Sequence, residues 1–362
     1  MPNSEPLSSP DATGASIGLL SPDDPVDETA ETVETVARRI ANGRPTKSSR
    51  RGWARGYQPP DEVKPVLKAM SRTNVVRSTL SAVGDLSALL ALSLAGAWAH
   101  MVLPAVAAWA VTVAVVLVIG RFGRAQECLV HEASHRNWQR NGKLNDVLAN
   151  LLAGFPTASQ VGAYRAQHVI HHAHLGSAED PDIQRYEEFK LEELTGLRRW
   201  DLAKAVARRL PRYNWGWYTT IGTNPVTVAL SGAWFVVVFG IVALLTSRGT
   251  ALVAWAHWLA GYALVLPTIR MIGEAGEHRY AKGNTVFNAT ISNLGWWHRW
   301  VIHPHGDGHH TLHHLWSSVP HHQIRKMHEA LAELDRDTFA GQIYWRAKVL
   351  ENVRQGLPSD RA

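Results

Sequence analysis

The strongest constraint on the fold is a set of four apolar runs, each close to the length of a membrane span. They cover roughly Leu80–Ala99, Leu103–Ile119, Pro225–Leu245 and Ala251–Ile269. A helix needs about 20 apolar residues to cross a hydrocarbon core of about 30 Å. The sequence therefore predicts four transmembrane helices. The alternative, four buried helices of a soluble α-helical protein, explains the regular pairing of the runs less well.

Very short links join the runs in pairs. His100–Val102 connects the first pair, and Thr246–Thr250 connects the second. Each pair should therefore form a helical hairpin that returns to the side it left. The N-terminal tail, residues 120–224 and residues 270–362 would then share one side of the membrane.

Basic residues indicate which side that is. The two hairpin links carry only Arg248, whereas many lysines and arginines flank the other ends of the runs. An excess of Lys and Arg marks the cytoplasmic side of a membrane protein. The sequence predicts a multi-pass protein of the inner (plasma) membrane. The flanking residues are Lys68, Arg72, Arg77, Arg121, Arg124, Arg208, Arg209, Arg212, Arg270 and Arg279.

The predicted fold class is all-α and integral to the membrane, with four transmembrane helices in two hairpins and a cytoplasmic helical domain. Residues 1–60, rich in Pro, Ser, Asp and Glu, are expected to be a disordered cytosolic tail. Residues 75–335 form the membrane domain, and residues 336–362 are expected to be a helical tail. The net charge of +6 fits an anionic membrane face. No nucleic-acid partner is expected.

Three histidine clusters suggest a metal site. They are His131-Glu-Ala-Ser-His135, His168-Val-Ile-His171-His172 and His310-Thr-Leu-His313-His314, the first, second and third boxes. Residues three and four apart share one face of a helix. With 19 histidines in 362 residues, an H-x-x-H-H triple is expected only about 0.05 times by chance. Solvent-facing helix histidines are therefore a poor explanation for two such triples.

The composition limits which metal chemistry is possible. One cysteine excludes a disulfide framework, a Cys-based zinc site and a self-contained iron–sulfur cluster. Imidazole and carboxylate must therefore hold any metal. Eight imidazoles are too many for one ion, so two ions are expected. Imidazole suits Fe, Cu, Zn and Ni, so the ligand type alone does not choose the metal.

These boxes resemble those of the membrane fatty-acid desaturase family, which includes related alkane and carotenoid oxygenases. The likeness extends to Asp180-Pro181-Asp182 after the second box, to Gly276-Glu277-His278, and to Leu315 and Val319-Pro320 after the third box. The resemblance implies two Fe ions, O2 as co-substrate and an external electron donor. It also implies a ligand set of nine histidines: His131, His135, His168, His171, His172, His278, His310, His313 and His314.

Two departures from the family pattern affect the third box. Leu312 stands where many members have Glu, and Trp296–His309 adds aromatic and polar residues before the box. His309 directly precedes His310, which leaves the ligand register open. The inserted residues either point to a substrate other than a plain acyl chain or form an interfacial Trp belt with solvated histidines.

Carboxylates near the boxes are candidates to orient the histidine ligands, because a ligating imidazole usually donates its other N–H. The preferred candidates are Glu127, Asp180, Asp182 and Glu277, with Glu132 and Glu274 also considered. Cys128 is expected to be a small packing residue. Asp85 and His257 interrupt apolar runs, where polar groups tend to be functional.

The resemblance implies an O2-dependent di-iron oxidoreductase that attacks C–H bonds of a lipid, with fatty acyl desaturation as the leading reaction. A hydroxylase or ketolase of a terpenoid, carotenoid or other apolar metabolite is the nearest alternative. A metal transporter and a zinc hydrolase are alternatives from other classes. No fused haem, flavin or nicotinamide motif is found, and His303-Pro-His-Gly is not one. Electrons are expected from a separate protein such as a ferredoxin with its reductase.

Overall fold

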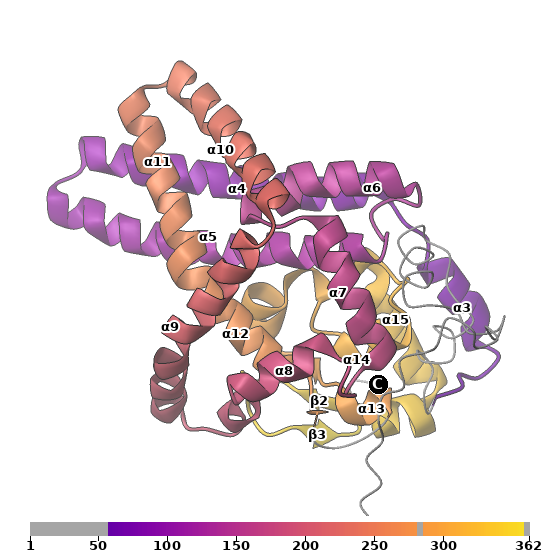
Figure 1. Ribbon diagram of the computed structural model, residues 1–362. Helices are drawn as coiled ribbons and strands as arrows, with labels where there is room; N and C mark the ends of the chain where they lie inside the picture. The colour runs from indigo at the N-terminus through magenta and orange to yellow at the C-terminus, as the bar shows by residue number, and fades with distance from the viewer. Residues whose placement is uncertain (1–56, 281–284, 358–362) are drawn as a thin grey trace, which may run out of the picture.

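The computed structural model describes residues 57–280 and 285–357 (Figure 1). The predicted N-terminal tail therefore lies almost wholly outside the described residues. The described chain is mostly helical, with three very short strands. This agrees with the predicted all-α membrane class in its helical content.

Four helical segments are long and apolar enough to cross a membrane, as predicted. They are α4 (Val75–Val102), α5 (Ala105–Ser134), α10 (Pro225–Leu245) and a final segment over Arg248–Glu277. Large apolar side chains point outward from them; Val106 is 86% exposed and Leu244 is 88% exposed. Such exposure suits contact with lipid tails, since these helices bury little of their apolar surface against the protein.

The final segment is continuous but changes its helical pitch. It consists of α11 (Arg248–Ala260), the π-helix η4 (Gly261–Val265) and α12 (Leu266–Glu277). A Cβ on Gly120 of α5 would lie 2.4 Å from the Val265 side chain, and one on Gly261 would lie 2.3 Å from Ile119. Glycine is therefore required at both positions for α5 and η4 to pack at this distance.

The long helices pack around a shared apolar core. Figure 1 shows α4 and α5 side by side, with α10 and α11 lying across them. Leu89, Ile119, Phe239 and Trp258 meet in this core, one from each long segment. The Asn74 side chain accepts a hydrogen bond from the backbone N–H of Arg77, and the Asn224 side chain accepts one from Thr227. These caps fix where α4 and α10 begin.

Most of the remaining helices gather at the end of α5 that carries the first box, and α9 (Arg199–Gly222) packs against α12 (Figure 1). Short links and backbone irregularities separate them, and the third box sits on a helix of only six residues. They are α3 (Val63–Met70), α6 (Gly142–Ala149), η1 (Asn150–Gly154), η2 (Phe155–Thr157), α7 (Val161–His174), α8 (Pro181–Glu188), η3 (Leu191–Leu194), α9 (Arg199–Gly222), α13 (Val286–Ala289), η6 (His298–Ile302), η7 (Pro304–Gly306), α14 (His310–Leu315) and α15 (His321–Leu334).

The prediction of a helical tail over residues 336–362 was wrong for most of its described part. One helical turn, η8 (Arg336–Ala340), is followed by β2 (Tyr344–Arg346) and β3 (Arg354–Gln355). β2 runs parallel to β1 (Ser292–Asn293) and antiparallel to β3. The strand forms because its backbone groups find partners far away in sequence, which outweighs local helix preference.

Candidate metal centre

Four elements bring the nine candidate histidines together. The first box lies at the end of α5, because α5 continues as a helix well past its apolar run. The second box lies on α7 and the third on α14, and His278 caps the end of α12. Eight of the nine are buried, and His135 is partly buried.

The histidines divide into two groups that cut across the three boxes. The five-histidine group holds His131, His135, His168, His172 and His313, and the four-histidine group holds His171, His278, His310 and His314. Within each group the candidate ligand atoms lie within 4.8 Å of one another. The second and third boxes contribute to both groups. The rings of His172 and His314 stack with their centroids 4.2 Å apart, so the two groups are neighbours.

The imidazole Nε2 atoms in each group face one another. Nε2 of His131 and Nε2 of His313 are 2.9 Å apart, and Nε2 of His310 and Nε2 of His278 are also 2.9 Å apart. Nε2 of His171 and Nε2 of His314 are 3.3 Å apart. Two nitrogens bound to one ion at about 2.1 Å would be about 3.0 Å apart at a right angle and about 3.4 Å apart at a tetrahedral angle. The spacing therefore fits ligands around a shared ion.

Burial keeps most of these imidazoles neutral. Burial and the neighbouring imidazoles lower the pKa well below the ordinary value for six of them: His135, His168, His172, His278, His313 and His314. Burial also lowers the pKa of His310, to about 4. A neutral imidazole has the free lone pair that a metal requires.

His171 is oriented by carboxylates from its own side of the centre. Its Nδ1 lies 2.8 Å from Asp180 Oδ1 and 3.5 Å from Asp182 Oδ2. Burial lowers the pKa of His171, but the charges of Asp182 and Asp180 outweigh burial and raise it overall. Asp180 also accepts the Asp182 backbone N–H and so begins α8. Since Nδ1 is used here, Nε2 remains available to the four-histidine group.

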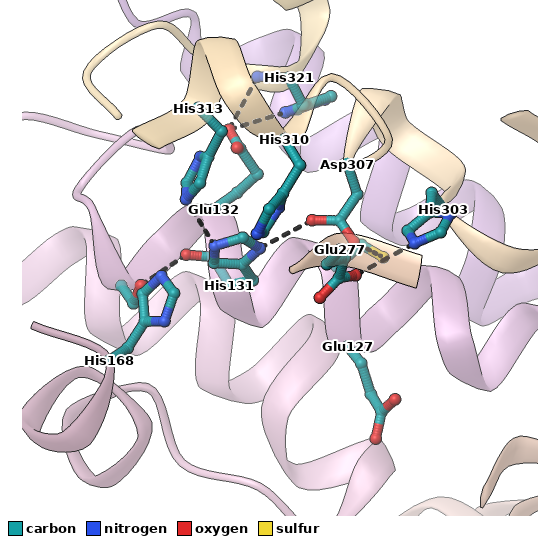
Figure 2. A network of polar contacts seen from close by, with 12 residues as sticks. Glu127, His131, Glu132, His168, Glu277, His303, Asp307, His310, His313 and His321 are labelled. Atoms are coloured by element: carbon teal, nitrogen blue, oxygen red, sulfur yellow. Dashed lines mark hydrogen bonds and ion pairs between the residues drawn. The ribbon is translucent and has the colours of Figure 1, made fainter. Parts of the chain in front are cut away.

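Asp307 orients His131 of the five-histidine group, as Asp180 orients His171 of the other group. Asp307 was not among the predicted orienting carboxylates. Its Oδ1 lies 2.8 Å from Nδ1 of His131 (Figure 2). Arg124 donates to its Oδ2 at 2.8 Å. Burial favours the protonated form of Asp307, but His131 and Arg124 hold its pKa well below the ordinary value. Its position in the Trp296–His309 segment was noted in the sequence, but no local spacing links it to His131.

Two of the predicted carboxylates have other partners. Glu127 forms ion pairs with Arg270 and Arg124, and Figure 2 shows it apart from the histidines. Glu277 lies 3.1 Å from Nε2 of His303 and 3.4 Å from Arg124. Neither contacts a histidine of the two groups in the described chain. Their ion pairs join α5 and α12 to each other next to the histidine groups.

The other two candidate carboxylates, Glu132 and Glu274, also have partners outside the two histidine groups. Glu132 accepts the backbone N–H of His321 at 2.7 Å, which ties α15 to α5. Glu274 pairs with Arg185 at 3.1 Å. Their contacts join helices around the centre.

The structure separates His309 from the two histidine groups. The ring of His309 lies 4.7 Å from the ring of His328 and belongs to neither histidine group. Leu312, at the family's Glu position, is fully buried in the apolar core beside α15. Cys128 is buried, as expected for packing, and its Sγ lies 3.5 Å from Asp307.

The polar residues within the apolar runs have distinct partners. Asp85 pairs with Nε2 of His305 at 2.6 Å and so holds the η7 turn against α4. His257 contacts Thr112 Oγ1 at 3.0 Å and the Val253 carbonyl at 2.7 Å. Asp85 thus joins α4 to η7, and His257 joins α11 to α5.

The comparison with known proteins agrees with this arrangement. The sequence pattern described as fatty acid desaturase matches residues 107–346. The chain belongs to the fatty acid desaturase family. It is also 41% identical over 71 residues to the dihydrorhizobitoxine desaturase of Bradyrhizobium elkanii. This alignment covers 19% of the chain and spans only 20% of that relative's length. No solved structure matches the chain.

Proposed function

We propose that this chain is a membrane di-iron oxidoreductase that uses O2 to remove hydrogen from C–H bonds of a lipid, with fatty acyl desaturation as its reaction. One observation carries the proposal: nine histidine Nε2 atoms face one another in two adjacent, mostly buried groups. Family membership supports the type of reaction.

The donor set supports iron in both groups. Nine imidazoles supply nitrogen ligands, which suit iron but also suit copper, zinc and nickel. The fatty acid desaturase family favours iron among these. When bound, a pair of irons would supply the O2-dependent oxidation of an unactivated C–H bond. The five-histidine and four-histidine groups would hold one ion each.

The protein's own part is to present neutral, fixed imidazoles in a site shielded from water. Asp307 and Asp180 accept hydrogen bonds from Nδ1 of His131 and His171, which fixes each ring and its tautomer. Asp180 is fully buried and Asp307 is nearly so. A shielded site of this kind protects the reacting carbon from competing reactions with water.

The same proposal includes the position in the membrane. We place the two helix pairs α4–α5 and α10–α12 as hairpins in the inner (plasma) membrane, with the histidine groups on the cytoplasmic side. The packing of α4 on α5 and of α10 on α11 supports the hairpins. The excess of Lys and Arg at the ends that carry the boxes supports the orientation.

A separate electron donor, such as a ferredoxin with its reductase, completes the proposed reaction. Exposed arginines at the start of α9 would suit an acidic donor, and the side chain of Arg198 is 93% exposed. Contact of these arginines with anionic lipid is the alternative.

Desaturation is preferred to hydroxylation or ketone formation on an apolar metabolite. The support is the name of the relative from Bradyrhizobium elkanii, which is a desaturase. That alignment is short, so the type of product must be read by experiment. Mass spectrometry of the product distinguishes the loss of two hydrogens from the gain of one oxygen.

The proposal is tested by metal analysis and O2 uptake of the protein purified in detergent. About two irons per chain and O2 uptake that depends on a reductant are expected. One zinc without O2 uptake would sink the proposal in favour of a hydrolase. Absence of tightly bound metal, together with metal flux into vesicles, would favour a transporter.

A further inference from the structure

Arg346, the last residue of β2, is a buried charge with two unpaired N–H positions. Its side chain is only 1% exposed. Neither its Nε nor its Nη1 has a hydrogen-bond partner within residues 57–280 and 285–357. A buried guanidinium requires acceptors or a paired ion, because it has lost its hydration. The unpaired nitrogens of Arg346 therefore have the capacity to donate to an anion.

The Glu351 carboxylate acts on Arg346 through its charge but forms no ion pair or hydrogen bond with it in the described chain. Burial lowers the pKa of Arg346 to about 10, partly offset by Tyr186 and Glu351, so the guanidinium stays protonated at neutral pH. The Glu351 carboxylate is already used by the backbone N–H groups of Ala347 and Lys348, at 2.9 and 3.0 Å. Burial and the nearby charges of His303 and Arg346 lower the pKa of His298 to about 3, so it is neutral.

Two further donors that lack acceptors lie around Tyr186, whose pKa is raised by burial and lowered in part by the charge of Arg346. Nη1 of Arg279 and the hydroxyl of Tyr280 are buried, and neither has a partner among the described residues. The Arg279 guanidinium lies 4.0 Å from the ring centroid of Tyr344. Tyr344 and Arg346 are two residues apart on β2 and so project from the same face of the strand. Arg279 and Arg346 therefore face the same space.

The donors lie next to the four-histidine group. The Tyr280 ring stacks on His278, with centroids 5.0 Å apart and planes at 18°. It also meets the edge of Tyr186, whose hydroxyl donates to the His278 carbonyl at 3.3 Å. A ligand held by Tyr280 and Arg346 would thus be one ring away from the proposed iron centre.

We propose that Arg346, Arg279 and Tyr280 form a binding site for an oxyanion, that is, a carboxylate or a phosphate group. The fork of N–H groups on a guanidinium matches two oxygens of such a group. Arg279 and Tyr344 are partly exposed, whereas Arg346 is buried. The ligand is either a free inorganic anion or the charged head group of the substrate, and the second source rests on the proposed function.

The test is the unfolding temperature of the iron-loaded full chain in detergent, followed by tryptophan fluorescence. Phosphate, octanoate and methyl octanoate are each added at millimolar concentration against chloride of equal ionic strength. Phosphate or octanoate should raise the unfolding temperature by about 3 °C or more, because a ligand of the folded state stabilises it. The uncharged methyl ester should not. A response to phosphate alone assigns a phosphate ligand, and one to octanoate assigns a carboxylate.

Arg346→Gln should abolish the anion-dependent rise. Arg354→Gln is the matched control, since Arg354 pairs with Trp345 across the same sheet but has a side chain that is 56% exposed. Tyr280→Phe provides a milder variant if Arg346→Gln fails to fold, and it should weaken anion affinity about 3- to 10-fold.

An unfolding temperature that no anion changes, or a rise of equal size in wild type and Arg346→Gln, would overturn the proposal. The measurement reports binding and needs no turnover. A chain that binds the anion but consumes no O2 would therefore keep this site and lose the proposed function.

Discussion

Nδ1 of His131 lies 2.8 Å from a carboxylate oxygen of Asp307, although 176 residues separate the two in sequence. This contact joins the end of a membrane helix to the turn that precedes the third box. It fixes the His131 ring with Nε2 directed at the other four histidines. The contact therefore makes Asp307 a positioning residue for the five-histidine group.

Asp307→Asn should weaken metal binding at the five-histidine group by about 10- to 100-fold, because the imidazole loses its charged acceptor. Iron per chain, measured after dialysis against a weak chelator, should fall toward one. Asp337→Asn is the matched control, since Asp337 is exposed. Full iron content in Asp307→Asn would refute the positioning role.

Asp180→Asn should act on the other ion. Asparagine can still accept the Asp182 N–H that begins α8, so the helix should survive while His171 loses its charged partner. Asp182→Asn should have a smaller effect, because Asp182 is 3.5 Å from His171 and its side chain is 53% exposed. Mössbauer spectra should show the loss of a different iron signal from that lost in Asp307→Asn. Equal loss of iron in Asp180→Asn and Asp182→Asn would contradict the larger role given to Asp180.

His310→Ala should lose iron from the four-histidine group, whereas His309→Ala should retain both irons. His309 contacts His328 instead of the candidate ligands. Iron analysis of the two variants checks which of these adjacent residues binds metal. Loss of iron from His309→Ala alone would move the register of the third box by one residue.

The metal-free protein should become less stable as the pH falls below about 6.5. Seven of the histidines have a folded-state pKa below that of an unfolded histidine, and for His310 it is about 4. The unfolded chain therefore binds more protons in this window, so the free energy of unfolding decreases with falling pH. His171 acts in the opposite direction, because its pKa is raised.

Denaturant unfolding of the metal-free protein between about pH 7 and pH 5 measures this decrease. Bound iron should oppose it until protons displace the metal, since the ligands must stay deprotonated. A free energy of unfolding that is constant over the window would contradict the burial of neutral histidines.

Gly96→Ala should destabilise the membrane helices by about 1–3 kcal/mol, because overpacking forces side chains apart. The added Cβ would lie 2.6 Å from the His257 ring, which Thr112 and the Val253 carbonyl hold in place. Gly84→Ala on the same helix is the matched control, since its Cβ would meet nothing within 4 Å. Thermal unfolding of the two variants should differ clearly, and equal values would contradict the close packing of α4 on α11.

Helix positions and candidate ligands could be read from the sequence because both depend on local periodicity. The run Pro225–Leu245 has the bounds of α10, and the three boxes have the spacing of a helix face. The division of the boxes into two groups was not predicted. That division depends on how α5, α7 and α14 approach one another in three dimensions.

The role of Asp307 and the C-terminal strands could not be predicted from local patterns, because both depend on contacts between residues far apart in the sequence. Asp307 follows His305 and Gly306, both with positive φ, and this irregular turn decides where its carboxylate points. Tyr344–Arg346 became a strand by pairing with Ser292–Asn293, about 50 residues earlier. Glu127 lies four residues before His131, so it was a preferred candidate to orient that histidine. In the structure it forms an ion pair with the buried Arg270 instead.

The division of the second and third boxes between both groups has a consequence for how such a centre can change during evolution. Neither α7 nor α14 belongs to one half of the centre, so deleting or exchanging either helix removes ligands from both halves. A single-ion descendant could arise only by point substitutions at individual histidines. The two halves of the centre therefore cannot be exchanged between relatives as separate segments of the chain.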